Sequence, residues 1–311
     1  MEKKCRIALF GECMIELRGQ MFGTMHQNFG GDTLNTAVYL ARLGAEAGIE
    51  VAYATQLGSD AYSNAMVAAW EQEGIDNSMV LREEGRMPGL YTIQVDESGE
   101  RTFYYWRDSS AAKAYFAGGS SPLEDQIGSC DAFYYSGISL AVLPVAGRER
   151  LFDFIARLRA RGGKVIFDNN YRKRLWPDGE AAIWFDRAFA ESDTAMITLD
   201  DNVQLYGLDE DSALSHAYAL SSDEVIIKRG VDPTLVRVRG MDPVAIPVFK
   251  VPKVVDTTGA GDSFAGGYLA ARLQGQSPEV AVRSGNKIAS IVVQYPGAII
   301  PREAMPVFFF T

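Results

Sequence analysis

The sequence predicts an α/β protein with a three-layer α/β/α architecture and a small β-sheet lid. Short apolar runs alternate with amphipathic segments over most of the 311 residues, which is typical of a parallel sheet with helices on both faces. Residues 88–108 interrupt this alternation, and two glycine-led helix starts lie at 30–31 and 259–261. No linker, repeat or low-complexity segment divides the chain, so we expect one domain over residues 1–311.

The first part of the chain supplies the first strands and helices of this pattern. The expected elements, in order, are strands over 6–12 and 13–18, a helix that starts near Asp32 or Thr33 and ends at Gly44, a strand over 51–58 and a helix over 60–74. The last of these helices has typical ends, because Asp60 is a favoured N-cap and Gly74 a favoured stop.

The interruption after this helix predicts an antiparallel ribbon. The expected lid has strands within 12–18 and 88–108, the second range forming a hairpin of 88–95 and 101–108 around a turn at 96–100. Tyr105 and Arg107 are two residues apart and therefore share one face, which suits a cover over a small polar ligand. In the alternative interpretation the exposed tyrosines pack against a second copy of the chain, forming a dimer through the lid.

The alternation resumes after residue 129. The expected elements are strands over 130–138, 164–170, 194–199 and 224–230, a meander of 234–240 and 244–251, and helices over 148–161, 262–274 and 278–293. Parallel strands end at one edge of a sheet, where α/β proteins bind their ligands. We therefore expect Asp168, Asn170, Arg172 and Lys228 at that edge.

Composition excludes several classes of function. The net charge is −10 and no run of basic residues is long enough for a nucleic-acid stripe, so we expect no nucleic acid partner. Two histidines exclude a histidine-rich metal site, and three scattered cysteines suit a reducing compartment. No apolar stretch has the length of a signal peptide core or a membrane span. We expect a cytoplasmic protein without a membrane partner.

The stretch DTTGAGDSFAGGY (256–268) carries the most specific chemistry. Glycines at a helix start let an anion approach the unpaired first amides closely, which favours a phosphate. Asp262 at the same place would repel a resting phosphate but accepts a proton from an attacking hydroxyl. Phosphoryl transfer to an alcohol needs both features. The alternative is a glycine turn in which Asp262 only caps the helix.

Together these features resemble the ribokinase-like sugar kinases of the phosphofructokinase B type. The resemblance rests on FGGDTLNTA (29–37) and DTTGAGDSFAGGY (256–268), and it covers the whole chain. Within the family, the segments that look like 2-keto-3-deoxygluconate kinases are GECMIEL, PGLY, GERTFYYWR, SGISLA, FDNNYRKRLW and GAIIPREAMP. This similarity implies transfer of the ATP γ-phosphate to the 6-hydroxyl of that keto acid.

The resemblance also implies roles for individual residues. The implied catalytic base is Asp262, and the implied anion hole is formed by the amides of Gly259, Ala260 and Gly261. The implied substrate-binding residues are Gly31, Asp32, Asn35, Tyr91, Tyr105, Arg107 and Arg172. The implied nucleotide-binding residues are Asp200, Lys228, Gly230, Gly259, Gly261 and Asn286.

ATP and Mg²⁺ are the cofactors that the resemblance implies, and it also admits a monovalent cation near Asp256. The sequence departs from the family pattern at one point. Where many members carry Asn-x-x-Glu, the corresponding stretch is taken as Asp200-Asp201-Asn202-Val203, and an apolar Val203 cannot order a hydrated metal. Asp200 is therefore expected beside the phosphates or metal, and no residue is assigned as a direct metal ligand.

Arg107 and Arg172 favour a sugar acid over a neutral sugar, because guanidinium groups bind carboxylates in a planar, two-pronged way. In the alternative interpretation both arginines form surface ion pairs. A fructokinase- or ribokinase-type kinase acting on a neutral sugar is the first rival function, and a binding module without turnover is the second. A dinucleotide-dependent oxidoreductase is disfavoured because the first strand leads into FGECMIE, which lacks G-x-G-x-x-G.

Overall fold

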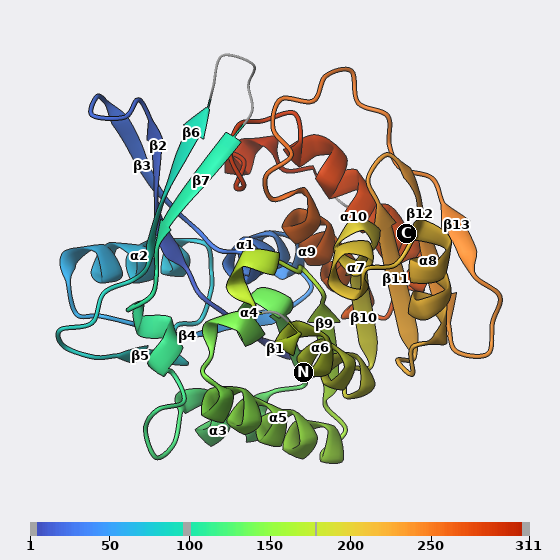
Figure 1. The fold of residues 1–311 in the computed structure, drawn as a ribbon, viewed down its shortest axis with the longest axis horizontal. Helices are drawn as coiled ribbons and strands as arrows, with labels where there is room; N and C mark the ends of the chain where they lie inside the picture. The colour runs from blue at the N-terminus through green and yellow to red at the C-terminus, as the bar shows by residue number, and fades with distance from the viewer. Residues whose placement is uncertain (1–4, 96–100, 178, 307–311) are drawn as a thin grey trace.

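The computed structural model describes residues 5–95, 101–177 and 179–306. Over these ranges the strands form a nine-stranded sheet in the body of the molecule and a four-stranded sheet beside it (Figure 1). The predicted fold class, an α/β body with a second small sheet, is confirmed. The predicted turn over 96–100 and the ends of the chain lie outside the described residues.

The large sheet is parallel from its β5 edge through β11 and antiparallel beyond. Its strands, in spatial order, are β13 (Val244–Ile246), β12 (Asp232–Val238), β11 (Glu224–Arg229), β10 (Thr194–Thr198), β9 (Lys164–Asp168), β8 (Ala132–Ser136), β1 (Arg6–Phe10), β4 (Glu50–Leu57) and β5 (Val80–Arg82). The predicted meander is confirmed as β12 and β13. Its second strand was predicted to reach residue 251 but ends before Pro247, which has no N–H to donate to a neighbouring strand.

Helices cover both faces of the large sheet. One face carries α1 (Asp32–Gly44), α2 (Ala61–Gln72), α9 (Ala260–Arg272) and α10 (Pro278–Val292), and the other carries α3 (Pro122–Asp125), α4 (Gly137–Val142), α5 (Val145–Ala160), α6 (Glu180–Ala190), α7 (Leu199–Tyr206) and α8 (Glu210–Ala219). Strand β1 shows the two cores directly, because Leu9 packs with the first group and Phe10 with the second. Helices α3, α4, α6, α7 and α8 were not predicted from the sequence, and α4 begins within the range 130–138 that was predicted as a strand. No described helix is both long enough and apolar enough to cross a membrane.

Short 3₁₀ turns complete the described fold at Ala111–Ala114, Ile127–Ser129, Lys173–Leu175 and Arg302–Ala304. The third of them, η3, follows β9 and lies at the ligand-binding edge that was predicted from the sequence. The predicted cap of α2 is also confirmed, because the Asp60 carboxylate accepts hydrogen bonds from the amides of Tyr62 and Ser63.

The small sheet contains the predicted hairpin and one strand that was not predicted. Its order is β3 (Met25–Gly30), β2 (Met14–Gly19), β6 (Leu90–Val95) and β7 (Arg101–Trp106). Strands β6 and β7 are antiparallel, with Tyr91 opposite Tyr105 and Ile93 opposite Phe103. Strand β3 reads MHQNFG, whose central polar residues lack the apolar alternation that marks a strand in sequence.

Helices α1 and α9 lie in close contact in the middle of the molecule (Figure 1). This contact brings Asn35 of α1 to Asp262 of α9. Gly266 makes this approach possible, because a Cβ atom there would lie 2.6 Å from the Tyr39 Cβ and 3.0 Å from the Thr36 carbonyl oxygen. Thr36 also donates its hydroxyl to the Asp262 carbonyl, at 3.2 Å. The start of α9 is therefore fixed against α1.

Replacing Gly266 with alanine should separate these helices. We expect Gly266→Ala to lower the free energy of unfolding by about 1–3 kcal/mol, because the added methyl group overpacks the contact. Gly119→Ala is the matched control, since a Cβ there meets no atom within 4 Å. Urea unfolding of both variants measures the difference. Equal stability of the two variants would contradict the close contact.

Candidate active site

A cavity of about 840 Å³ lies between the carboxyl ends of the large sheet's strands, the start of α9 and the small sheet. Eleven of the residues to which the family resemblance gives a role line it: Gly31, Asp32, Asn35, Tyr91, Tyr105, Arg107, Arg172, Lys228, Gly259, Gly261 and Asp262. They come from both sheets and from segments far apart in sequence. The cavity is therefore the candidate active site.

The loop before α9 is held in one conformation. Gly259 is the N-cap of α9 with a φ of 73°, and a Cβ atom there would lie 2.7 Å from the Ala298 carbonyl oxygen. The buried Asp256 carboxylate accepts hydrogen bonds from the amides of Thr258, at 2.8 Å, and Gly297, at 2.7 Å. Thr258 and Gly261 line the cavity on either side of Gly259. The helix start thus presents backbone amides where an anion is favoured.

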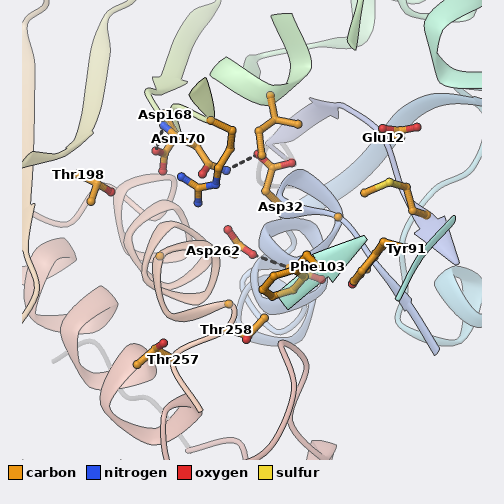
Figure 2. Close-up of a pocket in the computed structure, with 18 of the residues that line it drawn as sticks. Glu12, Asp32, Tyr91, Phe103, Asp168, Asn170, Thr198, Thr257, Thr258 and Asp262 are labelled. Atoms are coloured by element: carbon orange, nitrogen blue, oxygen red, sulfur yellow. Dashed lines mark hydrogen bonds between the residues drawn. The ribbon is translucent and has the colours of Figure 1, made fainter. Parts of the chain in front are cut away.

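Asp262 lies in the first turn of α9 and faces the cavity (Figure 2). Its carboxylate accepts a hydrogen bond of 2.8 Å from the Asn35 side-chain amide. Burial and the negative charges of Asp32 and Asp168 raise the pKa of Asp262 to about 7, against the opposing effects of Asn35 and Lys228. A carboxylate with that pKa is suited to take a proton near neutral pH.

Two further carboxylates surround the same space, and each has a fixed partner. Asp32 accepts hydrogen bonds of 2.6 Å from the Ser136 hydroxyl and from the Asn170 side-chain amide, and burial raises its pKa. Asp168 accepts a hydrogen bond of 2.8 Å from the Lys228 ammonium. Figure 2 shows Asp32, Asp168 and Asp262 around one cavity. Lys228 therefore places a positive charge beside this acidic group of side chains.

The small sheet contributes the other wall. Tyr91 and Tyr105 are stacked, with ring centroids 5.6 Å apart, and Phe103 packs against both rings. Tyr91 donates its hydroxyl to Glu16. Arg107 follows β7 and forms a buried ion pair with Glu12, which follows β1. Glu16 and Glu12 thus hold two of the predicted substrate-binding residues, Tyr91 and Arg107, in place.

Four of the residues to which the resemblance gives a role do not line this cavity. They are Ala260, Asp200, Gly230 and Asn286. Asn286 is buried, with its amide bonded to the Thr234 hydroxyl and the Pro247 carbonyl. Asp200 is exposed on the first turn of α7. The nucleotide contacts expected of Asp200, Gly230 and Asn286 stay predictions. So does the anion-hole role of Ala260, whose amide donates to the Thr257 carbonyl at 3.2 Å.

Several lining residues were missed by sequence reasoning. Thr198 is the N-cap of α7, and Asp201 lies one turn later, so both face the cavity. Aligning the family's Asn-x-x-Glu pattern with residues 200–203 places its first and last positions on Asp200 and Val203. A helix start at Leu199 would have placed the corresponding pair at Thr198 and Asp201. Glu12 and Arg174 also line the cavity. They lie in GECMIEL (11–17) and FDNNYRKRLW (167–176), but the resemblance gave neither residue a role.

Asp201 is the partner of Arg172. Both Asp201 oxygens lie 3.3 Å from one Arg172 nitrogen, and burial raises the pKa of Asp201. Within the described ranges, no group of three or more histidine, cysteine or carboxylate side chains is placed to hold a metal ion. A metal at this edge would need ligands from a bound substrate or water.

The sequence matches known proteins along nearly its whole length. Residues 4–305 match the model of the pfkB family of carbohydrate kinases. A 2-dehydro-3-deoxygluconokinase from Escherichia coli is 47% identical over 98% of this chain and 100% of its own, and one from Dickeya dadantii is 47% identical over 96% and 98%. A 2-dehydro-3-deoxygluconokinase from Haemophilus influenzae is 39% identical over 96% and 97%.

Solved structures share the fold. A PfkB protein from a Polaromonas species matches with a TM-score of 0.80 and 25% identity, covering 94% of this chain and 97% of its own. The aminoimidazole riboside kinase of Salmonella enterica, solved with its riboside and an ATP analogue, matches with a TM-score of 0.78 and 25% identity over 94% and 95%. The fold of this chain is thus shared with a PfkB protein and with a riboside kinase.

The raised pKa of Asp262 predicts a pH-dependent stability. Folding raises this pKa above the value of about 3.9 in an unfolded chain, so the folded protein takes up a proton and loses stability as pH rises from about 4 through 7. Asp262→Asn removes this loss and can still accept the bond from Asn35. We expect the variant to be more stable than the natural protein at pH 8, by about 4 kcal/mol, with the difference shrinking toward pH 5. Thermal unfolding across this range measures it, and a pH-independent difference would contradict it.

Proposed function

The chain belongs to the pfkB family of carbohydrate kinases, and from that premise we propose that it transfers the γ-phosphate of ATP to the 6-hydroxyl of 2-keto-3-deoxygluconate. The observation that carries the proposal is the full-length similarity, at 47% identity, to 2-dehydro-3-deoxygluconokinases. The cavity supports it because a proton acceptor and an anion-binding helix start lie side by side. The neutral-sugar alternative has weaker support, since the relatives from Escherichia coli, Dickeya dadantii and Haemophilus influenzae are all sugar-acid kinases.

In this proposal Asp262 accepts the proton of the attacking hydroxyl. Asn35 holds its carboxylate in place, and the neighbouring Asp32 keeps its proton affinity high. Asp32 accepts hydrogen bonds from fixed donors, so its remaining lone pairs are oriented toward a sugar hydroxyl. The substrate would thus be positioned by the start of α1 while α9 supplies the base.

The phosphate side uses the amides at Gly259 and Gly261 together with Lys228. These groups fit an ATP γ-phosphate, because backbone donors and an ammonium converge on a cavity that already contains the proton acceptor. Mg²⁺ bound with ATP would neutralise phosphate charge, and Asp201, which lines the cavity at the start of α7, would hold it. The carboxylate of Asp256 orients the loop and does not need to meet the substrate.

The small sheet would act as a lid over the sugar acid, with Tyr91, Tyr105 and Arg107 contacting it. On the opposite side of β7, Tyr104 and Trp106 are exposed, which supports the expected dimer through the lid. A location in the cytoplasm is part of the same proposal, since the three cysteines of the chain form no disulfide.

The proposal predicts a ranking of substrates. Release of ADP should be fastest with 2-keto-3-deoxygluconate and slower with fructose, ribose and gluconate. Asp262→Asn should lower the turnover number by about 10³-fold, because the proton acceptor is lost, while leaving the dissociation constant of the keto acid nearly unchanged. A coupled assay and calorimetry measure the two quantities. Faster turnover of fructose or ribose would disprove the assignment to a sugar acid.

Asp200 and Asp201 are neighbouring carboxylates in the first turn of α7, and only Asp201 lines the cavity. Asp201→Asn should raise the Mg²⁺ concentration needed for half-maximal turnover by about tenfold, because the lining carboxylate is lost. Asp200→Asn is the matched control and should change it little, since that side chain is exposed and outside the cavity. Titration of Mg²⁺ at saturating ATP measures both. The opposite order would show that Asp200, as first expected from the sequence, is the functional residue.

A further inference from the structure

Four cationic side chains line the cavity, and three of them have a carboxylate partner inside the protein. Arg107 is paired with Glu12, Arg172 with Asp201 and Lys228 with Asp168. Each pair carries no net charge. The fourth cation is Arg174, and among the described residues it has neither a carboxylate partner nor a hydrogen bond.

Arg174 is nevertheless held in a defined place. It belongs to η3 (Lys173–Leu175), which follows β9 of the large sheet, while its guanidinium lies 3.9 Å from the centroid of the Tyr105 ring on the small sheet. Tyr105 is itself stacked on Tyr91. A guanidinium over an aromatic face leaves the N–H groups at its edge available to a ligand. Arg174 therefore spans the two sheets and still has donors to offer.

The charges around Arg107 argue against this residue as the sole acid receptor. Its guanidinium is neutralised by Glu12, and Glu16 receives the Tyr91 hydroxyl close by. A substrate carboxylate added there would find Arg107 already compensated by Glu12 and would lie close to the buried Glu16. The donor proton of Tyr91 is also used by Glu16, so this hydroxyl offers the substrate an acceptor. These groups fit hydroxyls or a keto oxygen better than an anion.

We propose that Arg174, held against Tyr105, binds the carboxylate of the sugar acid and is the residue that selects an acid over a neutral sugar. This inference rests on the proposed function and deepens it. When the acid is bound, its carboxylate lies between the two sheets and gives Arg174 the partner that the protein does not provide. Arg107 and Arg172 then contact the rest of the substrate while staying paired with Glu12 and Asp201.

The test compares Arg174→Ala, Arg174→Lys and Lys173→Ala in the full-length enzyme. Lys173 is the matched control, because it is an exposed cation of the same turn that does not line the cavity. We expect Arg174→Ala to raise the KM for 2-keto-3-deoxygluconate about tenfold or more through loss of a charge-assisted bond. The KM for ATP and the turnover number should stay within about twofold, because the phosphate side is untouched. Arg174→Lys should recover part of the loss, and Lys173→Ala should behave like the natural protein.

Ionic strength provides an independent readout. The KM of the natural protein for the keto acid should rise with added potassium chloride, because salt screens the attraction between the two charges. Arg174→Ala should flatten this dependence, and Lys173→Ala should keep it. An unchanged KM in Arg174→Ala, or an equal rise for ATP, would overturn the inference while leaving the proposed function intact. Absence of keto-acid turnover in the natural protein would instead overturn the proposed function, and the inference with it.

Discussion

The structure depends on keeping the Asp262 carboxylate buried beside two others, those of Asp32 and Asp168. Burial of the Asp262 carboxylate is unfavourable, and the negative charges of Asp32 and Asp168 add to that cost. The protein offsets the repulsion with fixed donors: Asn35 for Asp262, Ser136 and Asn170 for Asp32, and Lys228 for Asp168. The positive end of α9 adds a further favourable term for Asp262. The remaining imbalance leaves Asp262 with a high proton affinity, which is the property that a general base requires.

This electrostatic arrangement explains why the helices are placed as they are. Asn35 reaches Asp262 only because α1 and α9 approach closely at Gly266, and the start of α9 is oriented by the buried Asp256. Both helices begin at the carboxyl edge of the parallel sheet, where Asp168 ends β9 and Lys228 lies one residue before the end of β11. Residues separated by more than 200 positions therefore meet with fixed geometry. Such positioning on rigid elements is what phosphoryl transfer mainly asks of a protein.

The parts of this arrangement that sequence could predict are those with a local signal. Short apolar runs predicted the parallel strands of the large sheet except β5, the caps at Asp60 and Gly74 predicted α2, and the glycine stretch predicted the start of α9. Strand β3 carries no such signal, since it is defined by its pairing with β2. The pairing of Asp201 with Arg172 depends on where α7 begins, and misplacing that start exchanged a lining carboxylate for an exposed one. Ion pairs such as Glu12 with Arg107 join distant segments, so spacing could not reveal them.

Ion pairs within the protein decide how charge is distributed along the cavity. At the end of the cavity near α9, backbone amides and Lys228 would bind an anion. This end carries no excess positive charge, because Asp168 compensates Lys228. Near the small sheet, Glu12 compensates Arg107 in the same way, so an arginine in a sequence motif is not by itself a receptor for an acid. Recognition of charge requires a group whose partner is missing until the ligand arrives. A guanidinium fixed by an aromatic ring meets that requirement, because stacking orients the cation without neutralising it.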